Sequence, residues 1–170
     1  MNPIVLANII SLAGCLLMVA IGLIRERKKI LLTQCVQWII LTISHLMLGG
    51  VTAAISNIIS IIRNLYSLRF RLTLPVKLGF LAVQAAITAF YNQMGLLGWL
   101  PFLAAGSFTL MMDTRDTKVL KLVIIFGQTL FAIYDISIKN YTSFAFDVAT
   151  VISTIIGIIM LLRGKNKTAE

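Results

Sequence analysis

Two polar side chains interrupt long apolar runs at matching positions. Asn57 lies about six residues into the run 51–71, and Asp147 lies about six residues into the run 141–163, roughly 9 Å from the start of a helix. An ionisable side chain deep in a membrane helix costs roughly 2.5–3.5 kcal/mol and therefore usually faces a cavity or a partner. We expect the two side chains to hydrogen-bond a small polar solute between them. The alternative is a structural pair that holds two helices together.

His45 and Asp135 form a second polar pair, near the ends of two further apolar runs. An imidazole and a carboxyl group could form a proton-sensitive gate at the outer end of such a site, because histidine titrates near neutral pH. Lys139 offers a different explanation, since it lies four residues after Asp135 and could form an interfacial ion pair with it.

Other polar or aromatic side chains could extend the same site. Trp38 lies too deep in its run for the interfacial aromatic belt, which favours a pocket wall or core packing. Asn64 follows Asn57 by seven residues on the same helix face and could extend a polar path towards the cytoplasm. Arg63 could extend to the cytoplasmic headgroups or form a cytoplasmic gate; pairing with Asp147 is less favoured, because the two differ by about 9 Å in depth. Further amides inside apolar runs could line the path: Gln37, Gln84 and Gln128.

The composition is that of an integral membrane protein. Of the 170 residues, 59% are hydrophobic and 12% are charged, against about 25% charged in soluble domains. The net charge of +9 comes from short basic clusters between the apolar runs, which indicates contact with anionic lipid and argues against nucleic-acid binding. Cys15 and Cys35 lie inside predicted helices without metal-ligand spacing, so we expect buried thiols and no metal or cofactor.

Seven apolar runs are long enough, or nearly so, to cross the hydrocarbon core as helices. Gly49 and Gly50 predict a tight turn between the second and third runs. The predicted spans are residues 3–24, 30–48, 51–70, 74–91, 96–112, 119–138 and 141–162.

The distribution of basic residues predicts the orientation of these spans. Thirteen Lys and Arg residues fall on the side that contains the C-terminus, whereas Lys139 is alone on the other side. Positive charge marks the cytoplasmic side, so the N-terminus is predicted outside and the C-terminus in the cytoplasm. The basic residues on the cytoplasmic side are Arg25, Arg27, Lys28, Lys29, Arg69, Arg71, Lys77, Arg115, Lys118, Lys121, Arg163, Lys165 and Lys167.

A shift of 90 positions superposes the second run on the sixth and the third on the seventh. The same shift places His45 on Asp135 and Asn57 on Asp147, and it aligns residues 25–28 with 115–118 in the order basic, acidic, any, basic. These matches predict a duplicated three-helix unit, residues 1–72 and 94–170, with a linker helix at 73–93. One linker helix makes the two units parallel, related by an axis along the membrane normal.

This 3+1+3 pattern, with a polar residue at one depth in the third and seventh spans, resembles the SWEET sugar transporter, PnuC and PQ-loop (MtN3-like) superfamily. Within that group, the cluster RERKK at 25–29 and the sequence ISNIISIIRNLYSLR at 55–69 look most like the YgjV family of bacterial inner membrane proteins. The resemblance implies an all-helical fold of seven transmembrane helices arranged as parallel triple-helix bundles.

The resemblance also implies a solute site. In the SWEET group, asparagines on spans three and seven flank the sugar and tryptophans on spans two and six stack on it. Asn57 and Trp38 match two of these positions, while Asp147 and either Gln128 or Phe131 stand at the others. A carboxylate at 147 would suit an amine-bearing solute or a proton-coupled cycle better than a neutral sugar.

The expected function is therefore transport of a small polar solute, such as a sugar, a vitamin or nucleoside, or an amine, across the bacterial inner membrane by alternating access. The alternative is a receptor or scaffold that binds a ligand without moving it. Catalysis is not expected, because His45 is the only histidine and no hydrolase, nucleotide or metalloprotease motif is present. Solute identity, proton coupling, direction and homo-oligomer formation stay open.

Overall fold

The regular structure of this protein is helical in every part of the chain that the computed structural model describes, residues 2–21, 27–112 and 117–166. Each predicted apolar run forms a helix, and a short 3₁₀ turn precedes the fifth. The elements are α1 (Pro3–Ile21), α2 (Arg27–Met47), α3 (Val51–Arg69), α4 (Leu74–Tyr91), η1 (Leu97–Trp99), α5 (Leu100–Met111), α6 (Thr117–Ser137) and α7 (Tyr141–Asn166).

Five of these helices, α2, α3, α4, α6 and α7, are long and apolar enough to cross a membrane. Shorter apolar helical stretches are found at Pro3–Val19 and Leu97–Met111. Helices satisfy all their backbone hydrogen bonds internally, which a chain in lipid requires. The predicted all-helical membrane class is confirmed at this level.

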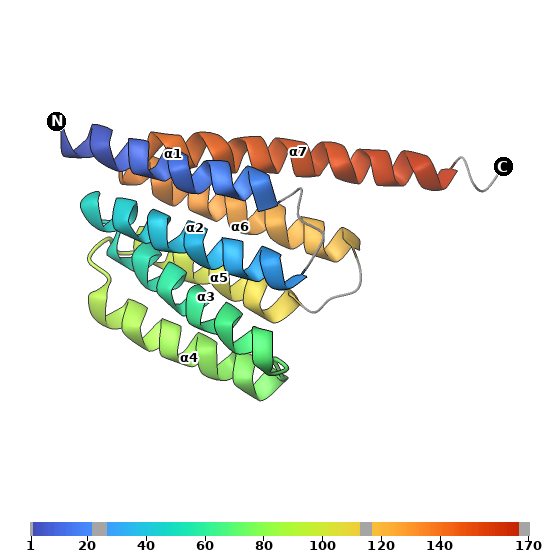
Figure 1. Cartoon of the computed structure of the whole chain (residues 1–170), viewed down its shortest axis with the longest axis horizontal. Helices are drawn as coiled ribbons and strands as arrows, with labels where there is room; N and C mark the ends of the chain where they lie inside the picture. The colour runs from blue at the N-terminus through green and yellow to red at the C-terminus, as the bar shows by residue number, and fades with distance from the viewer. Residues whose placement is uncertain (1, 22–26, 113–116, 167–170) are drawn as a thin grey trace.

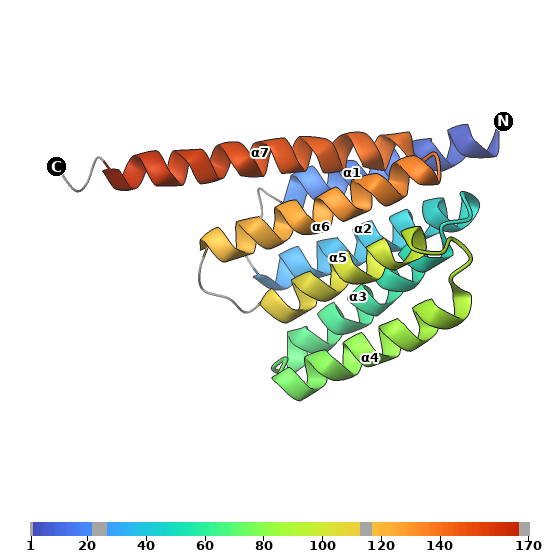
Figure 2. The same cartoon turned by 180° about the vertical axis from the view of Figure 1, so that it is seen from behind.

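The helices form two layers (Figures 1 and 2). One layer contains α1, α2 and α3, and the other contains α7, α6 and α5. The layers meet at their edges, where α1 contacts α7 and α3 contacts α5, while α2 and α6 lie in the middle of their layers. α4 packs outside, against α3 and α5. Six helices therefore surround a central region, and the seventh flanks them.

The turn between α2 and α3 closes as predicted at two glycines. Gly49 adopts a positive φ of 77°, and the Gly50 N–H donates to the His45 carbonyl at 2.7 Å. This is the Schellman closure, in which a residue in the left-handed conformation ends the helix. The turn between α6 and α7 has the same form: Lys139 has a φ of 64°, and the Asn140 N–H donates to the Asp135 carbonyl at 2.8 Å.

Polar contacts join the layers at this end of the bundle. The Asn8 side chain on α1 donates to the Lys139 carbonyl at 3.0 Å and accepts from the Thr142 N–H at 2.9 Å. Thr52 on α3 donates to the hydroxyl of Tyr134, which is fully buried on α6. These bonds hold α6 and its turn to α7 against α1 and α3, at the end of the bundle where His45 and Asp135 lie.

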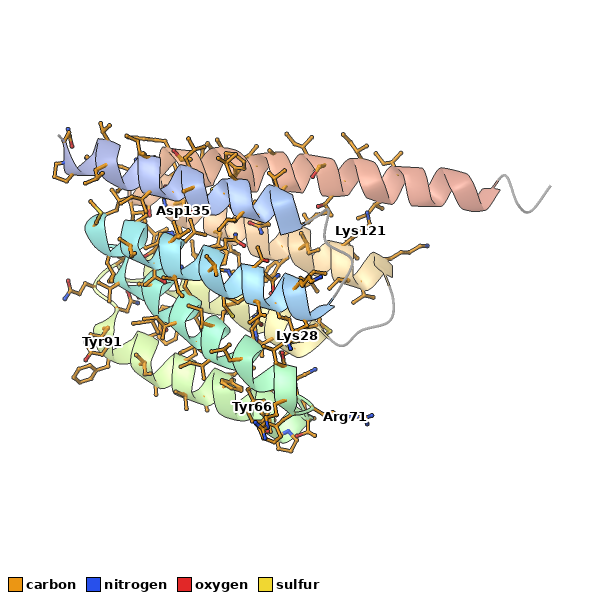
Figure 3. The ribbon with its side chains drawn as sticks, viewed as in Figure 1. Lys28, Tyr66, Arg71, Tyr91, Lys121 and Asp135 are labelled. Carbon is orange, nitrogen blue, oxygen red and sulfur yellow. The ribbon has the colours of Figure 1, made fainter. Side chains whose placement is uncertain are left out.

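Basic residues gather at the opposite end of the bundle. In Figure 3, Lys28, Arg71 and Lys121 lie towards one end, whereas Tyr91 and Asp135 lie towards the other. This is the separation that the predicted topology requires. Part of the predicted basic pattern lies outside the described residues: Arg25, Glu26, Arg115, Asp116 and Lys167.

Candidate functional site

A cavity of about 380 Å³ lies between the two layers. All six surrounding helices contribute to its wall, whereas no residue of α4 does. Ligand pockets for small molecules typically span about 300–1,000 Å³ and are mostly apolar with a few polar groups. The polar or aromatic lining residues are Gln34, Gln37, Trp38, Asn57, Ser60, Arg63, Phe108, Gln128, Phe131 and Thr150.

A smaller cavity of about 70 Å³ adjoins the first. The two cavities share wall residues, among them Trp38, Asn57 and Gln128, so these side chains lie at the boundary between the two cavities. The smaller cavity also has His45, Asp135 and Asp147 in its wall. Most of the residues that the sequence singled out therefore meet in one region.

His45 is held from two sides. The Asn57 amide nitrogen, which is a donor only, lies 3.1 Å from Nδ1 of His45, and Nε2 of His45 lies 3.0 Å from Oδ1 of Asp135. Since Nδ1 accepts, Nε2 carries the hydrogen and donates to the carboxyl group. Both side chains of the His45–Asp135 pair are almost fully buried. Asp135 is thus bonded to His45 rather than to Lys139, and the interfacial ion pair is not found.

Asp147 lies beside Asp135. Their carboxyl groups interact, and Asp147 is 8% exposed. One of its oxygens, Oδ2, is buried with no hydrogen-bond partner. Asn57 and Asp147 are close to the same small cavity, but Asn57 donates to His45 instead of bonding Asp147 directly. This carboxyl oxygen therefore lies beside the small cavity without a hydrogen-bond partner.

Arg63 does not reach the lipid headgroups. Its side chain is only 2% exposed, and the guanidinium lies 5.6 Å from the ring centre of Trp38 and 5.5 Å from that of Phe108. Nη1 donates to the Thr109 hydroxyl at 2.6 Å and Nη2 to the Asn64 side-chain oxygen at 3.3 Å. Snorkelling was the wrong expectation, because aromatic faces and two acceptors inside the bundle hold the group there.

Two other predicted residues lie behind the cavity wall. Asn64 is fully buried, donates to Gln34 at 2.9 Å and accepts from Arg63, so it supports wall residues and is not itself in the wall. Gln84 on α4 donates to Ser56 at 2.8 Å and joins α4 to α3. Neither lines the cavities. Trp38, Gln37 and Gln128 do line them.

Several wall residues were not predicted from the sequence. Ser60 and Thr150 line the large cavity, and Thr109 holds the guanidinium of Arg63. Serine and threonine are common in apolar helices, where they bond the preceding turn as Thr150 does to the Phe146 carbonyl. A signal was nevertheless present: Ser60 and Thr150 are separated by the same 90 positions as the other pairs.

Nothing in the described part of the chain is arranged to hold a metal ion: no three His, Cys, Asp or Glu side chains come together there. The predicted thiols, Cys15 and Cys35, are free and buried. The site offers hydrogen bonding, a buried cation and buried carboxyl groups.

Apolar helices of spanning length around a central cavity define a helical integral membrane protein with an internal cavity. The chain belongs to the Imp-YgjV family, bacterial inner membrane proteins, whose family model matches residues 5–165. The match confirms the resemblance to the YgjV family and the inner-membrane location. In the other two comparisons, no curated protein and no solved structure matches the chain.

Proposed function

We propose that this protein is a transporter or facilitator that moves a small polar solute across the bacterial inner membrane by alternating access. The observation that carries the proposal is the cavity of about 380 Å³ between the layers, with polar groups from both. Its mostly apolar wall contains a buried arginine and several amides, and polar or ionisable side chains inside a membrane bundle are costly and typically mark a solute or ion path. The cycle requires no chemical step and no cofactor.

A duplicated 3+1+3 architecture supports this mechanism. Residues 90 positions apart face the same cavities from opposite layers, and the two Schellman turns match hydrogen bond for hydrogen bond. α4 stays outside, where a linker helix would lie. The cavity would then lie on the axis between two three-helix units that rock against each other. The paired wall residues are Met18 and Phe108, Gln34 and Ile124, Gln37 and Gly127, Trp38 and Gln128, Leu41 and Phe131, His45 and Asp135, Ser60 and Thr150, and Asn57 and Asp147.

In this proposal Trp38, Asn57, Gln128 and Asp147 contact the solute. The pair His45 and Asp135, joined by a hydrogen bond of 3.0 Å between the layers, forms the outer gate. Arg63, held by Asn64, lies in the half of α3 that ends at Arg69, and in this proposal that end faces the cytoplasm because basic residues favour the cytoplasmic side.

Labelling of single cysteines tests the alternating access. In a background with Cys15→Ser and Cys35→Ser, Ser60→Cys and Thr150→Cys each place a thiol in the cavity wall. Both should react with a membrane-impermeant maleimide in right-side-out and in inverted vesicles. Ile155→Cys, on the exposed surface of α7, is the matched control and should stay unlabelled from both sides. Reaction of the cavity thiols from one side only would contradict transport.

One observation favours the receptor alternative. Arg63 is a buried cation in the cavity wall, and a closed basic pocket is what a receptor for an acidic ligand needs. Ligand binding combined with labelling from one side only would support that function instead.

A further inference from the structure

Arg63 carries a charge that the described part of the protein does not neutralise. The carboxylates in the described part of the chain are Asp135 and Asp147. The remaining acidic residues lie outside the described ranges: Glu26, Asp113, Asp116 and Glu170. Asp135 is paired with His45, and neither carboxylate makes an ion pair with Arg63. An isolated buried cation is destabilising, so a bound anion would stabilise the buried guanidinium.

The guanidinium also has unused donors. It has five N–H groups, and its bonds to Thr109 and Asn64 use two of them. Nε is buried without any hydrogen-bond partner. A buried donor left without an acceptor is destabilising, and a bound acceptor would remove that penalty.

The aromatic neighbours restrict where an acceptor can approach. Trp38 and Phe108 both lie within 6 Å of the guanidinium carbon and both belong to the wall of the large cavity. A cation at this distance is attracted to an aromatic face. Because the rings do not accept the in-plane N–H groups of the guanidinium, those groups can still donate to an oxygen acceptor. Carboxylate and phosphate oxygens are the groups that match this donor fork, often through two parallel bonds.

We propose that Arg63 is the anchor for an oxyanion, so that the solute of the large cavity is a small organic carboxylate or phosphate. This inference rests on the proposed function and specifies its substrate class. Asp147 and Asp135 lie in the adjoining small cavity, where like charge would repel the anionic group. The solute is therefore oriented, with its oxyanion at Arg63 and its hydrogen-bond donors towards Gln128 and Asp147.

The test is a set of thermal-shift measurements on the purified full-length protein with matched pairs of probes at equal ionic strength. The pairs are benzoate and benzamide, glutarate and glutaramide, and glycerol 3-phosphate and glycerol. At a hundred times its Kd, a ligand should raise the melting temperature of a chain of this size by about 5–10 °C. We expect a shift with an anionic member of a pair and none with its neutral partner. The carboxylate and phosphate pairs distinguish the two kinds of oxyanion.

Two variants assign the effect to the guanidinium. Arg63→Gln should abolish the shift in melting temperature. Arg63→Lys keeps the charge but loses the planar guanidinium, and it should lower the affinity for the anionic probe at least tenfold. Arg69→Gln, at the exposed C-terminal end of the same helix, is the matched control and should bind as the unmodified protein does. The comparison of the anionic with the neutral probe uses the unmodified protein alone. It therefore tests whether the cavity binds an oxyanion even if Arg63→Gln fails to fold.

The results separate this inference from the proposed function. Equal shifts with neutral and anionic members, shifts that survive Arg63→Gln, or the absence of any shift would each overturn the oxyanion anchor. The first two of these would leave a polar-solute transporter intact. Labelling of Ser60→Cys and Thr150→Cys from both sides would keep the transporter in the third case, whereas labelling from one side would remove it as well.

Discussion

Nε2 of His45 and Oδ1 of Asp135 lie 3.0 Å apart although the two residues are 90 positions apart in the chain. The bond joins α2 to α6, the two helices in the middle of the opposing layers. Asn57 completes the arrangement, because its amide nitrogen donates to Nδ1 of the same ring. The imidazole is thus one of the links between the layers, beside the smaller cavity.

The His45–Asp135 bond predicts a strong coupling between the two residues. His45→Ala should lower the free energy of unfolding by about 3–5 kcal/mol, because it leaves a buried carboxyl group without its partner. Asp135→Ala should cost a similar amount. The double variant should cost clearly less than the two single losses together, as a double-mutant cycle in detergent would measure. Thr129→Ala, at an exposed position of α6, is the control; additive losses would contradict the coupling.

Trp38 should stabilise the protein through its contact with Arg63. Trp38→Leu removes one aromatic face from the buried guanidinium of Arg63 and should destabilise the protein by about 1–2 kcal/mol. Trp38→Phe keeps an aromatic face and should lose less. Melting curves compare the two, with Trp99→Phe as the control for loss of a tryptophan outside the cavity. Equal losses for Leu and Phe would show that the aromatic face contributes nothing.

The two matching turns should respond to substitution in opposite directions. Gly49→Ala should destabilise by about 1 kcal/mol, because a positive φ of 77° is strained for alanine even though the added Cβ meets no atom within 4 Å. Lys139→Gly should stabilise by about 0.5–1 kcal/mol, because Lys139 has the same left-handed conformation. Melting temperatures of both variants check the signs. A loss on Lys139→Gly would mean that its side chain makes a stabilising contact.

Asn8 should stabilise the junction of α1 with the α6–α7 turn. Asn8→Ala removes a donor to the Lys139 carbonyl and an acceptor from the Thr142 N–H, which should cost about 1–3 kcal/mol. Asn8→Asp keeps the acceptor and loses the donor, so an intermediate loss is expected. Denaturant unfolding of the three proteins gives the order; an Asp variant weaker than the Ala variant would contradict this division of roles.

Local properties of the chain determined the helices. The apolar runs predicted the boundaries of α3 and α4 to within one residue, and Gly49 predicted the turn between α2 and α3. These features depend on run length and on the backbone freedom of glycine, and both can be read along the chain. The pairing of His45 with Asp135 could also be predicted from the sequence, because the shift of 90 positions aligns the two residues.

The burial of the Arg63 side chain was decided only by the tertiary structure. Along the chain it is an arginine twelve residues into an apolar helix, where snorkelling is the usual outcome. Its burial depends on Trp38 from α2 and on Phe108 and Thr109 from α5. Helix periodicity gives the face on which a side chain lies, but not which helices pack against that face. The sequence by itself therefore determined the helices and their polar positions, whereas the packing of the two layers decided which side chains enclose the cavity.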